Sequence, residues 1–362
     1  MLDDIVYVGT YTRSLPHVDG KAEGIYSCRF DRQNGSLEII GTAQGVENPS
    51  FLTLDPRRRF LYAVEETDTY GDAPGGAISA FAIDPSNGAL TFINRQLTHG
   101  ATPCYVSITP NGRWALVANY MGGNISVLPI SEDGSLAPAS AVVQHTGPAP
   151  IRDGSHPHAI RSDPAGNFIL VSDLGMNRIV VYTLNEASGA LTANPNESEI
   201  AADQAGPRHM TFSPDGRLLY CINEVNLTVT VYAYDREAGT LHAVQTVPTL
   251  PATAAGSSGN SCADLHLHPS GRFLYGSNRG HDSIATFAVG DDGLLTPIGH
   301  TSTGGSTPRN FAVDPQGEFL LAANQNSSTI VTLRIDPAQG LPQPTGIVAQ
   351  VPTPVCVQFA TG

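Results

Sequence analysis

Four ionisable residues have the types needed to act on an anionic substrate. The stretch GPRHMTFSPDGRLLYCINE carries Arg208 near one end and Glu224 at the other, while His158 precedes it and Arg279 follows it in the chain. Arginine binds a carboxylate or phosphate through parallel hydrogen bonds and stabilises a negative oxygen, and histidine transfers protons near neutral pH. The set therefore suits a reaction in which negative charge develops on an oxygen atom.

This stretch is one copy of a repeat that must position these residues. Each copy reads as a strand, a tight turn that begins with proline, and a second strand, with a polar residue nine positions after that proline. The copies are NPSFLTLDPRRRFLYAVEE from Asn48, TPCYVSITPNGRWALVANY from Thr102, HPHAIRSDPAGNFILVSDL from His156, GPRHMTFSPDGRLLYCINE from Gly206, SCADLHLHPSGRFLYGSNR from Ser261 and TPRNFAVDPQGEFLLAANQ from Thr307. The fixed spacing predicts six hairpins of equal length.

A second signal, Gly-x-Leu, falls between the hairpins. It recurs at Gly35, Gly88, Gly134, Gly189, Gly239 and Gly293, with a degenerate seventh copy at Gly340. Seven such turns with six complete hairpins imply a seventh hairpin split between TPVCVQFA at the C-terminus and DIVYVGTY at the N-terminus. Repeats of about 50 residues rich in strand signals are typical of four-stranded propeller blades. We therefore predict an all-β fold, a single seven-bladed β-propeller domain over residues 1–362 with one blade closed by both termini.

A propeller brings both open ends of every hairpin to one face. The inner strand of each blade lines the central channel and the tight turn sends the chain straight back, so both ends meet at one channel mouth. The incoming position, six residues before the turn proline, holds Ser50, Cys104, His158, Arg208, Ala263 and Arg309. The two outgoing positions, nine and ten residues after it, hold Glu65–Glu66, Asn119–Tyr120, Asp173–Leu174, Asn223–Glu224, Asn278–Arg279 and Asn324–Gln325. We expect His158, Arg208, Glu224 and Arg279 to converge there as catalytic residues.

Other polar residues near these positions are candidates for substrate binding. They are His156, His209, Asn223, Asn278, His281, Arg309 and Tyr120. Structural explanations compete with this assignment, because a repeated Asn or Asp is more often a turn former and a single arginine is often a solvated loop charge. The two histidines of SHPH could likewise cap a turn. The shared register of four ionisable residues favours a functional site.

Composition excludes several classes of partner. The formal net charge of −14 over 362 residues argues against binding to nucleic acid or an anionic membrane. No apolar run approaches the ~18–20 residues of a membrane span, and the N-terminus MLDDIVYVGTY lacks signal-peptide features. Five widely spaced cysteines without a CxxC pair fit reduced, buried thiols. We expect a cytoplasmic monomer or weak homo-oligomer whose partner is a small anionic molecule.

Other catalytic motifs are missing from the sequence. It contains no Gly-x-Ser-x-Gly elbow, no P-loop and no HExxH motif. His266 and His268 in DLHLHPS stand two apart on a predicted strand, which is weak evidence for a metal, and we interpret them as packing residues. We therefore predict neither a metal site nor a cofactor.

The segments SHPHAIRSDPAGNF, GPRHMTFSPDGRLLYCINE and SNRGHDSIATF resemble the propeller-type lactonase family. That family includes seven-bladed bacterial 6-phosphogluconolactonases and the fungal 3-carboxy-cis,cis-muconate lactonizing enzyme. The resemblance runs over essentially the whole chain, from VYVGTYT at Val6 onward. In the fungal enzyme a histidine, two arginines and a glutamate are implicated, and the matching positions here are His158, Arg208, Glu224 and Arg279. The resemblance implies no metal, unlike the calcium-dependent gluconolactonase propellers, whose ligand pattern is not found.

The resemblance leaves the reaction open. The first hypothesis is hydrolysis of a sugar-acid lactone, with 6-phosphogluconolactone giving 6-phosphogluconate as the leading case and an unphosphorylated sugar lactone as the next. In it His158 or Glu224 acts as general base, and Arg208 and Arg279 hold the anion and the oxyanion. The second is muconate cycloisomerisation, which also handles an anionic lactone. A third, non-enzymatic reading is an interaction scaffold, because fold-level analogy does not define function.

Overall fold

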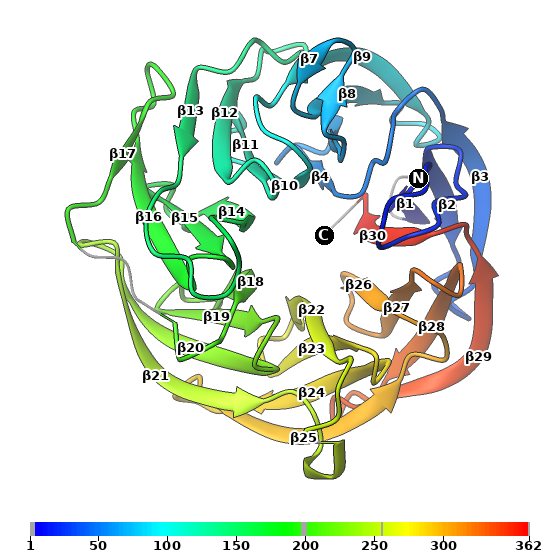
Figure 1. Ribbon diagram of the computed structural model, residues 1–362. Helices are drawn as coiled ribbons and strands as arrows, with labels where there is room; N and C mark the ends of the chain where they lie inside the picture. The colour runs from blue at the N-terminus through cyan, green and yellow to red at the C-terminus, as the bar shows by residue number, and fades with distance from the viewer. Residues whose placement is uncertain (1–3, 197–200, 255, 361–362) are drawn as a thin grey trace.

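Each repeat copy forms the two innermost strands of a four-stranded antiparallel sheet. The computed structural model describes residues 4–196, 201–254 and 256–360, and within these ranges seven such sheets stand around a common axis as propeller blades (Figure 1). The innermost strands of neighbouring blades contact one another all around the ring, which closes where β30 (Pro354–Phe359) meets β4 (Leu52–Leu54). The predicted seven-bladed propeller is confirmed.

The strands follow the chain from the first blade to the seventh, each blade being written from the inside outward. The first blade contains β4, β5 (Phe60–Glu65), β8 (Ala77–Ile83) and β9 (Leu90–Leu97); the second β10 (Pro103–Ile108), β11 (Trp114–Asn119), β12 (Asn124–Pro129) and β13 (Ala141–Gln144); the third β14 (Pro157–Ser162), β15 (Phe168–Asp173), β16 (Arg178–Leu184) and β17 (Leu191–Ala193). The fourth contains β18 (Pro207–Phe212), β19 (Leu218–Asn223), β20 (Thr228–Asp235) and β21 (Thr240–Pro248); the fifth β22 (Ser261–Leu267), β23 (Phe273–Arg279), β24 (Ser283–Val289) and β25 (Leu295–Ser302); the sixth β26 (Pro308–Val313), β27 (Phe319–Asn324), β28 (Thr329–Ile335) and β29 (Pro342–Gln350). The seventh contains β30, β1 (Ile5–Thr10), β2 (Ile25–Phe30) and β3 (Leu37–Ala43), and outside the blades lie the hairpin β6 (Thr69–Tyr70) and β7 (Ala73–Pro74) and the short 3₁₀ helix η2 (Ala252–Ala254).

Strands from both ends of the chain complete the seventh blade, as the sequence predicts. β1 pairs with β30 in antiparallel register, with Tyr7 opposite Gln358 and Val8 opposite Val357. Because β30 forms the inner strand of this sheet and pairs with β1, hydrogen bonds between the two ends of the chain fasten the ring.

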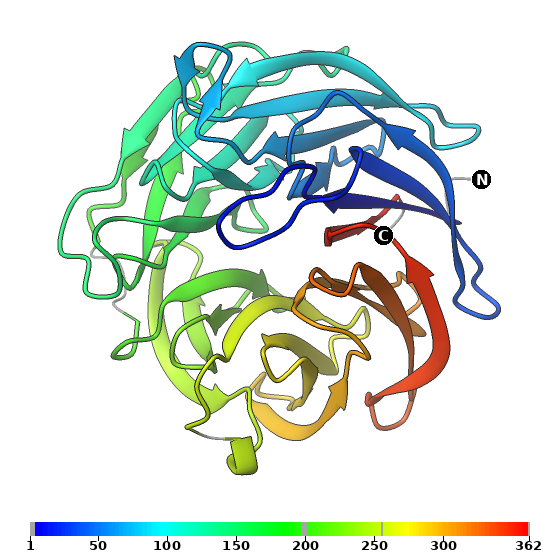
Figure 2. The same ribbon diagram turned by 45° about the vertical axis from the view of Figure 1, so that its right-hand side comes forward.

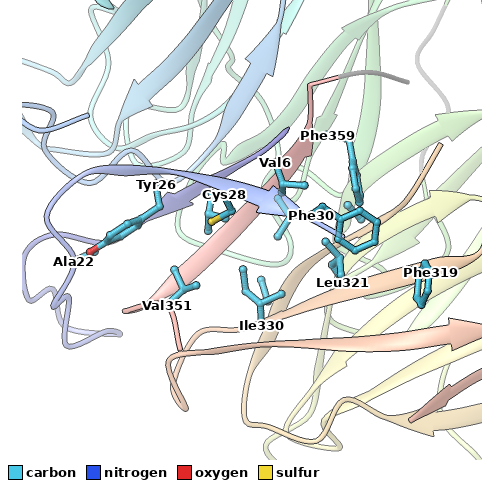
Figure 3. Close-up of a cluster of buried hydrophobic side chains, with 14 residues drawn as sticks. Val6, Ala22, Tyr26, Cys28, Phe30, Phe319, Leu321, Ile330, Val351 and Phe359 are labelled. Atoms are coloured by element: carbon cyan, nitrogen blue, oxygen red, sulfur yellow. The ribbon is translucent and has the colours of Figure 1, made fainter. Parts of the chain in front are cut away.

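The apolar core lies between the blades. Each of the seven contacts between adjacent blades contains one cluster of buried apolar side chains. Between the sixth and seventh blades, Phe30 meets Phe319 and Phe359 edge to face at ring-centre distances of 5.7 and 5.4 Å (Figure 3). Burial of one such side chain contributes roughly 2 kcal/mol, so each blade is stabilised chiefly by its neighbours.

The two repeated sequence signals bind one blade to the next. In four blades the tyrosine of the returning inner strand donates its hydroxyl to the carbonyl of a Gly-x-Leu glycine in the following blade, at 2.8 to 3.0 Å. The pairs are Tyr7–Gly88, Tyr62–Gly134, Tyr220–Gly293 and Tyr275–Gly340. The equivalence of Tyr7 and Tyr62 confirms that the N-terminal strand takes the returning place in its hairpin.

A segment after β1, residues 11–24, reaches toward the centre of the ring and is called the N-terminal strap. Figure 2 shows it in dark blue, projecting from the seventh blade over the middle of the molecule. Its Tyr11 and Val18 pack against Val355 at the start of β30. The Thr353 hydroxyl donates to the Tyr11 carbonyl at 2.7 Å. The strap is thereby anchored beside the channel mouth.

Candidate active site

A β-bulge at the incoming position re-aims the predicted site residues. In β10, β14, β18 and β26 the pairing with the following strand skips one or two residues immediately after the first proline. The skipped residues are Cys104, His158, Arg208 with His209, and Arg309. A bulge bends its strand and turns the extra side chain away from the regular alternation. Each of these blades therefore directs its incoming side chain by the same local irregularity.

The outgoing residues are held at the same end of the hairpins. In five blades the backbone N–H of the second outgoing residue donates to a carbonyl just before the inner strand of its own blade. The donors are Glu66, Tyr120, Leu174, Glu224 and Gln325, and the acceptors are Asn48, Thr102, His156, Gly206 and Thr307. The incoming and outgoing side chains of neighbouring blades therefore meet at one channel mouth.

Glu224 joins two arginines from neighbouring blades. Its Oε2 accepts hydrogen bonds from Arg208 Nε at 3.0 Å and from Arg279 Nη2 at 2.9 Å. Burial alone would raise the pKa of Glu224, but the charges of Arg279 and Arg208 outweigh burial and lower the pKa below its ordinary value. Glu224 is therefore a carboxylate at neutral pH, and its tightly held charge makes it a weak proton acceptor.

Arg208 is committed to partners inside the protein. It is 2% exposed, and besides Glu224 it donates through Nη1 to the carbonyl of Ala263 and to Nε2 of His209. Burial, together with the charge of Arg279, lowers the pKa of Arg208 to about 10. The guanidinium therefore stays charged at neutral pH, with its donors arranged around Glu224 and the channel.

His209 is held in one tautomer by a buried aspartate. Because its Nε2 accepts from Arg208, its Nδ1 donates to Asp264 Oδ1, at 2.6 Å. Asp264, 3% exposed, also accepts from His266 Nε2 at 2.8 Å and from the side-chain amide of Asn310. Burial and the charge of Arg208 lower the pKa of His209 to about 4. A neutral His209 therefore connects Asp264 to Arg208 and orients the guanidinium.

His158 lies between aromatic rings at the end of the bulge. It is 5% exposed, its ring centre is 5.3 Å from that of Tyr120 and 5.4 Å from that of His209, and its Nδ1 is 3.8 Å from the Cys104 sulfur. Burial and the charge of Arg208 lower the pKa of His158 well below its ordinary value. The imidazole is therefore neutral near pH 7 and has a nitrogen lone pair available.

These side chains surround a cavity of about 470 Å³ at the channel mouth. Its lining includes His158, Glu224, Arg279, Arg309 and Tyr120, all five of which the sequence predicts. A narrow space between Cys104 and His158 continues inward, where Arg208 and His209 form part of the wall. The structure thus brings together the four predicted catalytic residues and three of the predicted binding residues.

Arg309 differs from the other two arginines of the site. No carboxylate in the described ranges lies within ion-pair distance of its guanidinium, whereas Arg208 and Arg279 share Glu224. Its guanidinium carbon lies 5.8 Å from the centre of the Tyr11 ring. Burial would lower the pKa of Arg309, but Tyr11 and Glu66 raise it above its ordinary value. A charged arginine without an ion pair therefore faces the cavity.

Arg279 also keeps an unused donor. Its Nη2 donates to the carbonyl of Cys262 at 2.8 Å, while its Nε is buried and has no hydrogen-bond partner in the part of the chain that the structure describes. Leaving a buried donor unpaired costs about 1–3 kcal/mol, and such groups are found where function requires them. Because this nitrogen is buried, contact of Arg279 with a substrate would use the part of its guanidinium that borders the cavity.

Four predicted binding residues do not line this cavity and have partners within the protein. Asn223 donates to the hydroxyls of Thr228 and Thr230, both at 2.9 Å, and Asn278 donates to the Thr249 carbonyl at 2.9 Å. His281 contacts Ser283, with Nδ1 2.7 Å from the hydroxyl oxygen, and His156 contacts the Tyr120 carbonyl, with Nδ1 2.9 Å from the oxygen. The asparagines therefore fasten the ends of their strands and His156 braces Tyr120. Substrate contact at these four positions stays a prediction.

Sequence reasoning missed the first blade and the strap. Glu66 and Ser50 of the first blade line the cavity or its inner extension, as does Cys104 of the second, and Leu15, Pro16 and His17 of the strap form part of the wall. The signal for Glu66 was present, because it stands ten residues after Pro56 just as Glu224 stands ten residues after Pro214. The strap lies outside the repeat, so its spacing held no comparable signal.

The remaining sequence expectations concern histidines, cysteines and membranes. His266 bonds to Asp264, and His268 Nε2 lies 2.9 Å from the Gly317 carbonyl, so both have protein partners. All five cysteines are buried and free, as predicted. Within the described ranges, none of the helices has the length and apolar character needed to cross a membrane.

The geometry supports ester or lactone chemistry on an anionic substrate. A neutral histidine can accept a proton from water, a charged arginine can hold an anion, and the donors of Arg279 can stabilise a tetrahedral oxyanion. All of these groups border one cavity of suitable size for a small molecule.

Comparisons with known proteins agree with this chemistry. The chain is 35% identical over 358 residues to the 6-phosphogluconolactonase of Bacillus subtilis, covering 98% of each protein. It is 33% identical to the 6-phosphogluconolactonase of Formosa agariphila, covering 92% of this chain and 93% of the relative. Among solved structures, the periplasmic gluconolactonase PpgL of Pseudomonas aeruginosa superposes with a TM-score of 0.90 at 34% identity, covering 98% of each chain.

The family follows from a match over nearly the whole chain. The sequence model described as "Lactonase, 7-bladed beta-propeller" matches residues 5–359, which include all seven blades and every residue of the cavity described above. The chain belongs to the seven-bladed β-propeller lactonase family and is a lactonase.

Proposed function

We propose that the protein hydrolyses a sugar-acid lactone, with 6-phosphogluconolactone giving 6-phosphogluconate as the leading reaction. The observation that carries this proposal is the cavity itself, where Arg309, free of any ion pair within the described ranges, lies beside a neutral His158. In a chain whose net charge is −14, such a local positive site favours an anionic substrate. Relatives named 6-phosphogluconolactonase support the choice of lactone.

The arginines have different roles in this proposal. The sequence pattern assigned the anion and the oxyanion to Arg208 and Arg279. The burial of Arg208 and its commitment to Glu224 favour Arg309 as the group that binds the phosphate or carboxylate. Arg279, which also borders the cavity, is then the donor for the oxyanion. Glu224, itself bonded to Arg208, holds Arg279 in place.

His158 is the proposed proton carrier. A water molecule attacks the lactone carbonyl carbon while His158 accepts its proton, and the carbonyl oxygen becomes an oxyanion stabilised by Arg279. The bond between the carbonyl carbon and the ring oxygen then breaks, and the ring oxygen takes the proton back from His158. The product is a hydroxy acid that ionises in water. No step uses a metal ion, so we propose metal-independent hydrolysis.

A second candidate substrate is an unphosphorylated sugar lactone. The gluconolactonase PpgL, which superposes closely on this chain, supports it. The cavity would take such a lactone through the same arginines, although a neutral substrate would make less use of Arg309.

A coupled assay tests the proposal. Purified protein is mixed with 6-phosphogluconolactone or gluconolactone, with and without a strong chelator, and formation of the hydroxy acid is followed against spontaneous hydrolysis. We expect catalysis in both conditions and a higher kcat/KM for the phosphorylated lactone. Rates equal to spontaneous hydrolysis for both lactones would refute lactone hydrolysis, and loss of activity with chelator would refute metal independence.

We also propose a reducing, cytoplasmic compartment, because all five cysteines are free. PpgL is described as periplasmic, so the compartment needs its own test. Fractionation of the source cells should recover the protein with cytoplasmic markers, and recovery with periplasmic contents would contradict this proposal.

A further inference from the structure

Glu66 is a second carboxylate at the cavity, and its environment differs from that of Glu224. It occupies the same repeat position in the first blade and is 5% exposed. The Tyr11 hydroxyl donates to both of its oxygens, at 3.0 Å to Oε1 and 2.9 Å to Oε2, and the Ser50 hydroxyl donates to Oε2. No arginine, lysine or histidine of the described ranges lies within ion-pair distance of it. Hydroxyl groups, rather than cations, therefore hold Glu66 in place.

The oxygen Oε1 retains room for another donor. An ionised carboxylate offers about four acceptor sites, and here one tyrosine proton is shared between the two oxygens while the serine proton goes to Oε2. Glu66 lines both the 470 Å³ cavity and its inner extension. A ligand hydroxyl in the cavity can therefore donate to Oε1, and a hydrogen bond to a charged oxygen is stronger than one to a neutral oxygen.

The strap supports this arrangement. His17 of the strap lies with Nε2 3.3 Å from the Tyr11 hydroxyl oxygen, which fixes the tyrosine that holds Glu66. His17 also borders the cavity, as does the exposed carboxylate of Asp68. This region of the lining therefore offers acceptor groups and negative charge beside the guanidinium of Arg309.

The two kinds of charge come from different parts of the ring. Glu66 follows β5 in the first blade, whereas Arg279 ends β23 in the fifth blade, and these blades stand on opposite sides of the axis in Figure 1. A ligand that spans the mouth therefore meets Arg279 on one side and Glu66 on the other, with Arg309 on the Glu66 side, where its guanidinium carbon lies 5.8 Å from the centre of the Tyr11 ring. Such a lining fits a molecule with one anionic group and several neutral hydroxyls.

We propose that Glu66 determines substrate specificity by accepting a hydrogen bond from a ring hydroxyl of a polyhydroxylated lactone and by repelling lactones that carry a second carboxylate. This inference rests on the proposed lactone hydrolysis. A substrate carboxylate placed at Oε1 would lie against a buried charge without a compensating ion pair, and like charges in such contact cost several kcal/mol. A hydroxyl at the same place adds a charge-assisted bond instead. Glu66 thus favours a sugar lactone over a dicarboxylated muconolactone.

Glu66→Gln tests the proposal because it keeps the shape and removes the charge. The measurement is kcat/KM for gluconolactone, 6-phosphogluconolactone and a muconolactone with two carboxylates, after thermal unfolding has shown that the variant is folded. The wild type should have a higher kcat/KM for the sugar lactones than for the muconolactone. Glu66→Gln should change the ratio of these kcat/KM values by about tenfold in favour of the muconolactone. The change should come mainly from KM, because the proposed contact is made in the ground state.

A second variant separates the two parts of the proposal. Glu66→Asp keeps the charge but withdraws it by one methylene, so it should still exclude the dicarboxylated lactone while raising KM for the sugar lactones. The matched control is Glu65→Gln, which removes the neighbouring buried carboxylate, whose partners Arg95 and Ser79 lie outside this cavity. That control should leave the substrate ratio unchanged.

The outcomes distinguish this inference from the proposed function. An active wild type with an unchanged ratio in Glu66→Gln would overturn the specificity role and leave lactone hydrolysis standing. A fall in kcat of equal size for every lactone, without a change in KM, would overturn it too, because Glu66 would then act on the chemical step. A wild type that hydrolyses none of the three lactones would refute the proposed function, and the inference with it.

Discussion

Oε2 of Glu224 lies 2.9 Å from Nη2 of Arg279, and the same oxygen accepts a hydrogen bond from Nε of Arg208 at 3.0 Å. One carboxylate thus holds two like-charged side chains from two blades, Arg279 at the cavity and Arg208 at its inner extension. Without it the arginines would repel each other, and their positions would no longer be fixed.

Replacing Glu224 with glutamine should therefore affect both stability and catalysis. Breaking a buried ion pair by removing one partner costs about 3 kcal/mol, and a displaced Arg279 should lower kcat/KM by roughly 100-fold. Thermal unfolding and steady-state kinetics measure the two effects. The control Glu38→Gln removes a carboxylate from the exposed pair with Arg29 and should change little. Unchanged kinetics in a folded Glu224→Gln variant would contradict the assigned role.

Arg309→Ala should weaken substrate binding more than it slows the chemical step. Loss of a charged arginine that binds an anion should raise KM for 6-phosphogluconolactone about 100-fold, with a smaller effect on kcat. Titration calorimetry with 6-phosphogluconate measures the same loss directly. Arg334→Ala serves as the control, because Arg334 lies over the Phe319 ring at 4.3 Å on the outer part of the sixth blade. A fall in kcat with KM unchanged would place Arg309 at the reacting atoms instead.

Acid should destabilise the protein before its carboxylates are protonated. The pKa of His209 is about 4 in the folded state and about 6.5 without the fold, so between these values the unfolded chain binds a proton that the folded chain does not. Stability should therefore fall as pH falls through this window, by roughly 1 kcal/mol per pH unit for one such histidine. His158, whose pKa is also lowered, acts in the same direction.

Thermal unfolding from pH 7 to pH 4.5 measures this dependence. His209→Gln, which can keep a donor toward Asp264 and an acceptor toward Arg208, should flatten the profile. His242→Gln, at an exposed position of β21, is the matched control and should reproduce the wild-type profile. If stability fell equally steeply with pH in the wild type and in His209→Gln, the conclusion that His209 is buried without a proton would be wrong.

Asn223→Ala should reduce stability without changing substrate affinity. Its side chain is fully buried and donates to two threonine hydroxyls, so the substitution leaves both without this partner and costs about 1–3 kcal/mol. Denaturant unfolding and the KM of the sugar lactone test the two statements. An increased KM in a stably folded variant would instead support the predicted contact of Asn223 with the substrate.

The spacing of the repeat predicted the ring of blades because the backbone geometry of the hairpin turn fixes that spacing. The Pro-x-Gly turn needs a residue with positive φ, and the glycines at 112, 166, 216, 271 and 317 have φ between 67° and 78°. The first copy has Arg58 there instead, with φ of 59°, yet its hairpin forms because the neighbouring blades hold the strands. The repeat therefore still predicts a hairpin in the copy that lacks the turn glycine.

The site could be predicted only where it follows the repeat. His158, Arg208, Glu224 and Arg309 were found by their position in the repeat. The β-bulge that aims His158, Arg208 and Arg309 could not be predicted, because it occurs at the same place in these copies and so does not change their spacing. Tyr11 and His17 were missed since the strap lies outside the repeat. Asn223 and Asn278 share the register of the site, but side-chain partners along their own strands decide where their amides point.

The most direct test compares wild type with His158→Ala on 6-phosphogluconolactone in the presence of a chelator. We expect hydrolysis above the spontaneous rate for the wild type and a loss of at least about 100-fold in kcat for the variant, with the fold retained. Hydrolysis by a folded His158→Ala variant at the wild-type rate would contradict the proposed catalytic role of this cavity.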